Sequence, residues 1–229
     1  TISTLLNDTA IDPITENAAD MLGYRAALST DGITRTEFDS NATSVQIATL
    51  GASFSAADLR RNVMLLEGSD VRPMRGDDFI GIIHPYVLYD LMSDNTAGGF
   101  IDVLKYSNAS VLIDGMTQMS GEAGKMAGVR LLKSTNVGST GAAPNTLYYT
   151  YIVGKGAVGA INLAGVGPSD VTNPEQQAFK VNVIKGGPQI ADPEGMIGSA
   201  VSYRFVYVAK TLDSTTYRYK IVLSNSSII

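Results

Sequence analysis

Alternation of apolar and polar residues near the C-terminus is the feature that most restricts the fold. The run SAVSYRFVYVAK places Val201, Tyr203, Phe205 and Tyr207 on one side of an extended chain, with smaller or polar residues mostly between them. LDST follows as a turn signal, and TYRYKIVLS then repeats the alternation. Two such runs joined by a turn predict a long antiparallel hairpin with one packed face.

Two helices are predicted in the first third of the chain. The first begins at Asp12, which suits the N-cap, and Pro13, which suits the first helical position. We expect it to end at Gly32, with the polar stretch TRTEFDSNATS forming a loop or a short strand. Its apolar face is formed by Ile14, Ala18, Met21 and Leu22.

The second helix has the clearer start. Ser55 and Asp58 have nearly the spacing and chemistry of a capping box, and Phe54 and Leu59 occupy the two positions of a hydrophobic staple. Gly68 marks its end. The predicted buried stripe is Leu59, Val63 and Leu66.

The remainder of the chain predicts mainly strands. FIGII is a short apolar strand, and Pro85 then opens a third helix with Val87 and Leu91 on one face. Further strands are expected around residues 129–132 and in LYYTYIV, AVGAINL and AFKVNVIKG. Two or three helices and a β-rich remainder predict an α+β fold and not an alternating β-α-β one.

Composition excludes several classes of function. The 229 residues are 45% hydrophobic, which suits a globular protein with a sizeable core, and the net charge is −5. A dedicated nucleic-acid-binding protein would show a basic patch or stripe, and this acidic chain lacks that footprint. Without cysteine, disulfides and thiolate metal sites are excluded. No apolar run reaches the roughly 20 residues of a membrane span, so we expect no membrane partner.

His84, the single histidine, is the first candidate for catalysis. As a general base it would be oriented by Asp78 or Asp90. As a structural residue it would end the FIGII strand and cap or pack at the helix that Pro85 opens, because a residue before proline prefers extended geometry. One histidine allows no multi-histidine metal site, and no Ser-His-Asp order is evident. The structural role is therefore favoured.

GKGAVG matches the G-x-G-x-x-G pattern of dinucleotide-binding loops through Gly154, Gly156 and Gly159. Such a loop must be followed by a helix whose N-terminus faces the pyrophosphate. AINLAGVGP follows instead, and its glycines and proline would cut a helix short. We favour a β-turn between two strands and keep a nucleotide-binding enzyme as the less favoured alternative.

Two further groups of side chains carry weaker alternatives. Carboxylates of a type that binds Ca²⁺ or Mg²⁺ are Asp77, Asp78, Asp90 and Asp94. Aromatic side chains of a type that stacks on sugars or bases are Tyr203, Tyr207, Tyr217 and Tyr219. The favoured interpretations are solvated carboxylates and tyrosines that pack across strands or fill a protein interface. We predict no catalytic residue, no metal and no cofactor, and therefore a structural or binding role and not an enzyme.

Four blocks of the sequence, taken together and in order, resemble a family of tailed-phage major capsid proteins. FIGIIHPYVLYDLMSDNTAGGFIDVLKYSN is similar to an axial-domain segment in which a hydrophobic strand, His-Pro and a helix precede a glycine-rich loop. GEAGKMAGVRLLKSTN, YIVGKGAVGAINL and IADPEGMIGSAVSYRFVYVAKTLD are similar to the next three blocks, the second of which is a hairpin in the family. The resemblance extends over most of residues 12–222.

This resemblance implies the HK97-type capsid fold, an α+β fold with a spine helix, a peripheral (P) domain with long antiparallel strands, and an axial (A) domain. The spine helix and a P-domain helix are expected within residues 1–78, the A-domain at 79–195, and a long β-hairpin returning to the P-domain at 196–229. The family's N-terminal arm and E-loop are not visible before Thr1, so we expect the sequence to be part of a longer subunit, with cleavage or disorder of that part as the alternatives.

The function that the resemblance implies is that of a major capsid protein. Its copies would self-assemble into the pentamers and hexamers of an icosahedral shell enclosing phage double-stranded DNA. Further copies of the chain are the main expected partners; decoration, scaffold and portal proteins are further candidates, and contact with packaged DNA is non-specific. The expected location is the virion capsid, assembled in the host bacterial cytoplasm. An encapsulin-like cellular compartment shell is the alternative with the same fold.

Contacts around the capsomer axis are expected in glycine-rich loops of the A-domain, because closed rings need heterologous contacts between identical subunits. The candidate interface residues are Thr96, Gly98, Gly99, Phe100, Gly115, Met116, Gly121 and Gly124.

Overall fold

The fold was analysed in a computed structural model of the 229-residue chain. The residues that the structure describes are 2–3, 14–41, 45–47, 53–94, 99, 122–141, 145–162, 179–184, 198–205, 207–213 and 217–227. The chain divides into two compact units. The first comprises residues 1–34 and 160–209, and the second comprises 35–159 and 210–229.

An antiparallel sheet of three strands characterises the first unit. β10 (Gly198–Phe205) lies between β1 (Ile2–Ser3) and β9 (Phe179–Ile184). The register of β10 and β9 runs from Ala200 opposite Ile184 to Phe205 opposite Phe179. The strand predicted at the start of SAVSYRFVYVAK is therefore confirmed. Its main partner is β9, which precedes it in the chain, and not the TYRYKIVLS run that follows it.

TYRYKIVLS also forms a strand, but in another sheet. β12 (Tyr219–Ser224) pairs antiparallel with β7 (Leu147–Val153) and parallel with β2 (Val45–Ile47). β11 (Tyr207–Thr211) pairs with β8 (Val158–Asn162). The predicted hairpin is therefore wrong. Period-two alternation identifies a strand and its buried face, but it does not specify the neighbouring strand.

A mixed seven-stranded sheet is the centre of the second unit. Its order is β2-β12-β7-β3-β5-β4, with β6 (Ser139–Thr140) paired to β7 beside this path. β3 (Phe79–Ile83) is antiparallel to β7 and parallel to β5 (Val129–Lys133), and β5 is antiparallel to β4 (Glu122–Met126). The mixed α+β class is confirmed, and the parallel pairs β3–β5 and β2–β12 are features that the sequence did not indicate.

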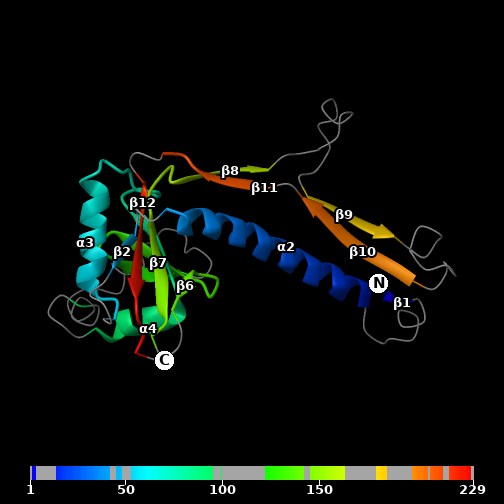
Figure 1. The fold of residues 1–229 in the computed structure, drawn as a ribbon, viewed down its shortest axis with the longest axis horizontal. Helices are drawn as coiled ribbons and strands as arrows, with labels where there is room; N and C mark the ends of the chain where they lie inside the picture. Colours follow the sequence, from blue (N-terminus) through cyan, green and yellow to red (C-terminus); the bar gives the residue numbers. More distant parts are fainter. Residues whose placement is uncertain are drawn as a thin grey trace. The chain divides into compact units, whose positions relative to one another are not determined.

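Two hydrophobic clusters lie on opposite faces of this sheet. Along β7, Ile152 belongs to one cluster, and Tyr151 and Val153 belong to the other. Along β12, which lies beside β7 in Figure 1, Val222 belongs to the cluster of Ile152, and Ile221 belongs to the cluster of Tyr151 and Val153. Successive side chains of a strand point to opposite faces. Both strands are therefore buried on both sides, which explains their consecutive apolar residues.

Two helices pack on the first of these faces, because their buried side chains share a cluster with Ile152 and Val222. They are α3 (Ala56–Glu67) and α4 (Pro85–Ser93). The predicted stripe of α3, together with Val87 and Leu91 of α4, is buried. The prediction of an apolar inner face for each helix is confirmed.

The predicted start of α3 is confirmed in detail. Ser55 Oγ accepts the backbone N–H of Asp58 at 3.3 Å, and Asp58 Oδ2 accepts the backbone N–H of Ser55 at 3.2 Å. Gly68 closes the helix as predicted, although its φ is −64°. The left-handed position falls two residues later, at Asp70, with φ of 56°. The capping box was predictable because both partners lie within one turn of the chain.

α2 (Ile14–Asp39) is longer than the sequence predicts. It continues through Gly32, the expected end, and includes the first residues of TRTEFDSNATS, which were expected to form a loop or strand. Its last turn carries Phe38, which is 8% exposed and belongs to the second cluster of the sheet. Tertiary packing therefore extends the helix beyond the point where the local pattern favours an end.

The apolar face predicted for α2 is only partly buried. Ala18 and Leu22 are half-buried, whereas Met21 is 68% exposed. The side chain of Ile14 lies outside the described residues. Ala26, which is buried, continues the series of Ala18 and Leu22 at four-residue intervals. The second buried position, Phe38, lies twelve residues farther on and about 120° around the helix axis from Ala26.

Replacing Gly32 with alanine is expected to raise the free energy of unfolding by about 0.5–1 kcal/mol. An added Cβ would meet no atom within 4 Å, and glycine loses more backbone entropy than alanine on entering a helix. Urea denaturation measures the change. Gly138→Ala is the control, because its Cβ would lie 2.6 Å from Tyr149 Cδ2 and should destabilise the fold. A less stable Gly32→Ala protein would contradict a continuous, unobstructed α2.

Candidate functional site

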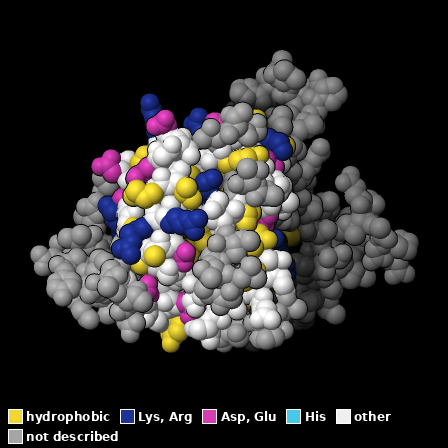
Figure 2. All heavy atoms as spheres, turned by 60° about the vertical axis from the view of Figure 1, so that its left-hand side comes forward, with side chains coloured by type: hydrophobic (Ala, Val, Ile, Leu, Met, Phe, Trp, Pro, Cys, Tyr) yellow, Lys and Arg dark blue, Asp and Glu magenta, His cyan; other side chains and the backbone are white. Residues whose placement is uncertain are grey.

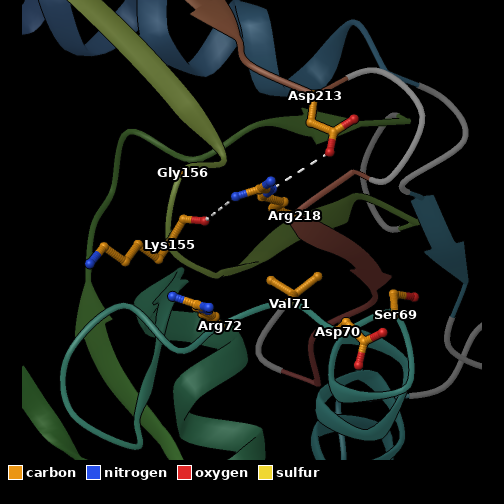
Figure 3. Close-up of a pocket in the computed structure, with 8 residues that line it drawn as sticks. All are labelled: Ser69, Asp70, Val71, Arg72, Lys155, Gly156, Asp213 and Arg218. Atoms are coloured by element: carbon orange, nitrogen blue, oxygen red, sulfur yellow. Dashed lines mark hydrogen bonds and ion pairs between the residues drawn. The ribbon is translucent and has the colours of Figure 1, made fainter.

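A hollow of about 680 Å³ opens in the second unit, beside the turn that joins β7 to β8 (Figure 3). Charged side chains of both signs line it, which suits a polar surface depression better than a site for an apolar ligand. These charged lining residues are Asp70, Arg72, Lys155, Asp213 and Arg218.

The GKG turn forms one wall of this hollow. The backbone N–H of Gly154 donates to the carbonyl of Arg218 at 2.9 Å, and the N–H of Lys155 donates to the carbonyl of Arg72 at 2.8 Å. A Cβ at Gly154 would lie 2.4 Å from Val71 Cγ1, so only glycine allows the turn to approach this closely. Backbone packing thus explains this glycine of the motif without a ligand.

The dinucleotide-binding alternative is contradicted by the element that follows the turn. β8 is a strand paired with β11, whereas a pyrophosphate site needs a helix N-terminus at this place. Arg218 is also engaged already, with Nη1 donating to the carbonyl of Lys155 at 3.5 Å and Nε lying 3.6 Å from Asp213 Oδ2 (Figure 3). The prediction of a turn between two strands is confirmed. The hairpin that the resemblance implies for YIVGKGAVGAINL is not confirmed, because β7 and β8 belong to different sheets.

His84 is the N-cap of α4. Its Nδ1 accepts the backbone N–H of Tyr86 at 3.2 Å. Its ring stacks on Tyr148, with centroids 4.4 Å apart and an interplanar angle of 19°. The side chain therefore fixes the entry of the chain into the helix, and the structural role predicted from the sequence is confirmed.

The carboxylates considered as partners of His84 are bound to other groups. Asp78 Oδ2 lies 3.1 Å from Arg130 Nε, and Asp78 Oδ1 lies 2.8 Å from Lys125 Nζ. Asp90 accepts the backbone N–H of Ser227 at 2.9 Å and a hydrogen bond from the same residue's hydroxyl. Each carboxylate is buried and has a structural function, so neither orients the imidazole for proton transfer. The interpretation of Asp78 and Asp90 as solvated carboxylates is therefore wrong.

Acid is expected to weaken the His84 cap. Burial lowers the pKa of His84 from 6.5, and a protonated Nδ1 has no lone pair to accept the Tyr86 N–H. Because the folded pKa is depressed, this contribution is complete above about pH 6.5 and decreases as pH falls below that value. His84→Asn keeps a capping oxygen that does not titrate and should show a smaller loss of stability between pH 7.5 and 5 in urea denaturation. An equal pH dependence in both proteins would contradict this role.

Three of the four tyrosines considered for stacking are used in internal contacts. Tyr219 is fully buried and accepts a hydrogen bond from Asn41 Nδ2 at 2.6 Å. Tyr217 packs edge-on against Tyr219, and the hydroxyl of Tyr207 bonds to a threonine of α2 at 2.8 Å. The side chain of Tyr203 lies outside the described residues. These three side chains are thus used inside the fold and not as a stacking platform, but the contacts are made to α2, to Asn41 and within one segment, not across strands as expected.

Metal and membrane sites were tested on the described part of the chain. There, no group of three or more His, Asp or Glu side chains has the arrangement needed to hold a metal ion. None of the helices within the same ranges combines the length and apolar character required to cross a bilayer.

Most of the residues expected to form contacts around the capsomer axis cannot be placed. Gly99 is buried, and Gly124 in β4 has φ of 143° at an irregularity in the β4–β5 register. Their role at an interface stays a prediction. The candidates outside the described residues are Thr96, Gly98, Phe100, Gly115, Met116 and Gly121.

A buried polar network, not predicted from the sequence, connects the end of α2 to the sheet. The Tyr151 hydroxyl accepts the backbone N–H of Gly138 at 2.9 Å and donates to Asp39 Oδ1 at 2.7 Å. Burial, followed by the bond to Asp39, raises the pKa of Tyr151 far above its usual value, and burial raises the pKa of Asp39. Tyr151 is buried and Asp39 is half-buried, so the network holds the end of α2 against the sheet from the inside.

Comparison with solved structures gives the fold a known counterpart. Along 99% of its length the chain is similar to a chain of the capsid of Ralstonia phage GP4, with a TM-score of 0.66, 12% identity and coverage of 71% of that chain. It is also similar to the capsid asymmetric unit of cyanophage Pam1, with a TM-score of 0.54, 13% identity and coverage of 99% of this chain and 73% of that one. The chain therefore has the fold of phage capsid chains. No family model and no curated protein matches the sequence.

Proposed function

We propose that this protein, on the basis of its capsid-type fold, is the major capsid protein of a tailed phage. The observation that supports the proposal is agreement of fold along 99% of the chain with two phage capsid chains. The candidate catalytic and nucleotide-binding residues that the structure describes have structural roles instead, which agrees with a subunit that acts through its surfaces. The proposed location is the virion capsid.

In the proposed mechanism, identical subunits form pentamers and hexamers that close into an icosahedral shell around double-stranded DNA. Rings of identical subunits need heterologous contacts. Each contact needs only modest affinity, because a subunit in a shell binds several neighbours at once. The net charge of −5 suits a container that confines DNA without holding it tightly through Lys and Arg contacts to phosphate. Scaffold, portal and decoration proteins are proposed as further partners.

The layout of the subunit is part of the same proposal. We assign α2 as the spine helix of an HK97-type subunit, with the P-domain at 1–78 and 196–229 and the A-domain at 79–195. These boundaries assign α3 and β12 to a different domain from β3, β5 and β7, with which they share the core or the sheet of the second unit. A structure of the assembled shell tests them directly.

The test of the proposed function is the size of the particle that the protein forms. Sedimentation velocity and negative-stain electron microscopy of the purified protein are expected to show closed polyhedral particles, with pentamers and hexamers as smaller species. A protein that is expressed from its whole coding sequence and remains monomeric under all assembly conditions would contradict the proposal. Terminase and portal genes next to the coding sequence are expected; a neighbouring cargo-enzyme gene would favour the encapsulin-like alternative.

A further inference from the structure

α4 is a surface helix with its one charged residue on the inside. Its sequence, PYVLYDLMS, contains a single charge, at Asp90. Asp90 is 8% exposed and lies on the buried side with Val87, Leu88 and Leu91. Its carboxylate accepts the backbone N–H of Ser227 at 2.9 Å. The charge that would normally keep the outer face of such a helix in water is therefore used inside the fold.

The outer face of α4 is apolar and aromatic. Tyr86, Tyr89 and Met92 follow one another at three-residue intervals, which places them along one side of the helix. They are 38%, 57% and 43% exposed. A helix that is hydrophobic on all sides is normally buried in the functional state of a protein. The composition of α4 thus fits a helix that is covered on both sides.

α3 provides the comparison within the same unit. Its outer residues include Met64 and Leu65, which are 60% and 40% exposed, but also the exposed Arg60 and Arg61. Figure 2 shows such a mixture of hydrophobic and basic side chains on the side of the molecule that α3 occupies in Figure 1. A mixed face of this kind is stable in water. The uncharged outer face of α4 is therefore a property of that helix and not of the whole surface.

The start of this face is held in place by ring contacts. Tyr86 packs edge-on against His84, with centroids 4.7 Å apart, and against Tyr148, with centroids 5.9 Å apart. His84 is fixed in turn by its capping bond to the Tyr86 N–H. An aromatic side chain that is already ordered loses little entropy on binding, so it is suited to anchor a protein–protein contact.

We propose that the outer face of α4, formed by Tyr86, Tyr89 and Met92, contacts a second copy of this chain in the shell. This inference rests on the proposed function. Each copy carries a net charge of −5, so two copies approach with least repulsion where no carboxylate is exposed. α4 meets that condition, because Asp90 faces inward and Asp94, which follows the helix, accepts the Ala56 N–H at 3.2 Å.

The size and position of the face agree with this occupant. Two partly exposed tyrosines and a methionine present roughly 300 Å² of side-chain surface, less than the ~800 Å² that each partner usually buries. The face therefore supplies the centre of a larger contact, where Tyr and Met are enriched. α4 leads directly into residues 96–100, where contacts around the capsomer axis are expected from the sequence.

The test compares assembly with subunit stability. Tyr89→Lys combined with Met92→Lys places two charges on the face and is expected to reduce the assembled fraction at least tenfold in sedimentation velocity and electron microscopy. The thermal unfolding midpoint of the unassembled subunit should change by less than about 2 °C, because both side chains face solvent there. Tyr89→Phe with Met92→Leu keeps the face apolar and should assemble normally. Ser139→Lys with Thr140→Lys, on exposed β6, adds the same charge elsewhere and should also assemble.

Three results would overturn the inference. Normal shells from the α4 lysine variant would show that the face is not a contact between copies. A large fall in the unfolding midpoint of the isolated variant would show that another part of the same chain covers α4. A wild-type protein that never assembles would overturn the proposed function as well, whereas normal assembly of both wild type and variant overturns this inference alone.

Discussion

Replacing Asp78 with alanine is expected to lower the free energy of unfolding by about 3–5 kcal/mol. The side chain of Arg130 is 2% exposed, and its Nε lies 3.1 Å from Asp78 Oδ2. Without the carboxylate, a guanidinium that cannot lose its proton remains in the interior without its counterion. Lys125, at 2.8 Å from Asp78 Oδ1, is 29% exposed and can turn to water, so Arg130 accounts for most of the loss.

The neighbouring residue supplies the control for this prediction. Asp77 is exposed, and Asp77→Ala removes the same charge one position earlier, so it should change stability by no more than about 0.5 kcal/mol. Arg130→Met in the Asp78→Ala background removes the buried positive charge and should recover most of the loss, since a buried ion pair is often replaceable by apolar residues. Urea denaturation measures all three. A loss below about 1 kcal/mol for Asp78→Ala would contradict a buried ion pair.

Arg130 also shows that the sequence predicts a strand but not the partner of a buried charge. The strand around residues 129–132 was predicted, and an arginine in the buried run VRLL implies an acidic partner inside the fold. The chain offers 22 acidic residues, and nothing local selects Asp78, which lies 52 positions earlier. The pair forms because β3 and β5 lie parallel, and that pairing is a property of the whole sheet.

Local signals predicted local structure well. The capping box of α3 and the N-cap of α4 involve residues two or three positions apart, and both were identified from the sequence. The end of α2 was not predicted correctly, because residues distant in the sequence determine it. Glu37 accepts the backbone N–H of Thr211 at 2.9 Å, and these two residues are 174 positions apart. The glycine at position 32 is a reasonable local stop, but packing of Phe38 against the sheet outweighs it.

The C-terminal strands also show that local structure was predictable and long-range pairing was not. Each strand was predicted, but the hairpin that would join them was wrong, because β10 and β12 belong to different sheets. One signal against the hairpin was present. Ile221 and Val222 are consecutive apolar residues, which a strand with a single packed face does not need, and they are buried on opposite faces of the sheet.

Of the candidate sites, those that depend on neighbouring residues were predicted correctly, and the one that depends on tertiary structure was not. His84 and the GKG turn were correctly judged structural, because the chemistry that each would need was missing from the neighbouring sequence. The outer face of α4 was not recognised as a candidate site, although Val87 and Leu91 were predicted on the inner face. The sequence did not show that Asp90, the one charged residue of the helix, is buried and leaves the face of Tyr89 without a charge.

Replacing Tyr151 with phenylalanine is expected to lower the free energy of unfolding by about 2–4 kcal/mol, although only one oxygen is removed. The buried N–H of Gly138 loses its acceptor, and the carboxylate of Asp39 loses a hydrogen bond while keeping Arg35 Nε at 3.8 Å from Oδ2. Water cannot easily replace the hydroxyl, since a Cβ at Gly138 would already lie within 2.8 Å of that oxygen and 3.0 Å of Asp39 Oδ2. Denaturation in urea at pH 7 measures the loss.

The pH dependence of this variant separates the network from simple packing. Burial raises the pKa of Asp39, and the Tyr151 hydroxyl opposes that effect, so the pKa rises further in Tyr151→Phe. A carboxyl whose pKa is higher in the folded state lowers the free energy of unfolding as pH increases through that pKa. The loss of stability in Tyr151→Phe relative to the wild type should therefore be larger at pH 7 than near pH 4. Tyr149→Phe, one ring away and half-buried, is the control and should change stability by no more than about 0.5 kcal/mol. Equal losses in the two variants, or a deficit independent of pH, would contradict the network's role in anchoring α2.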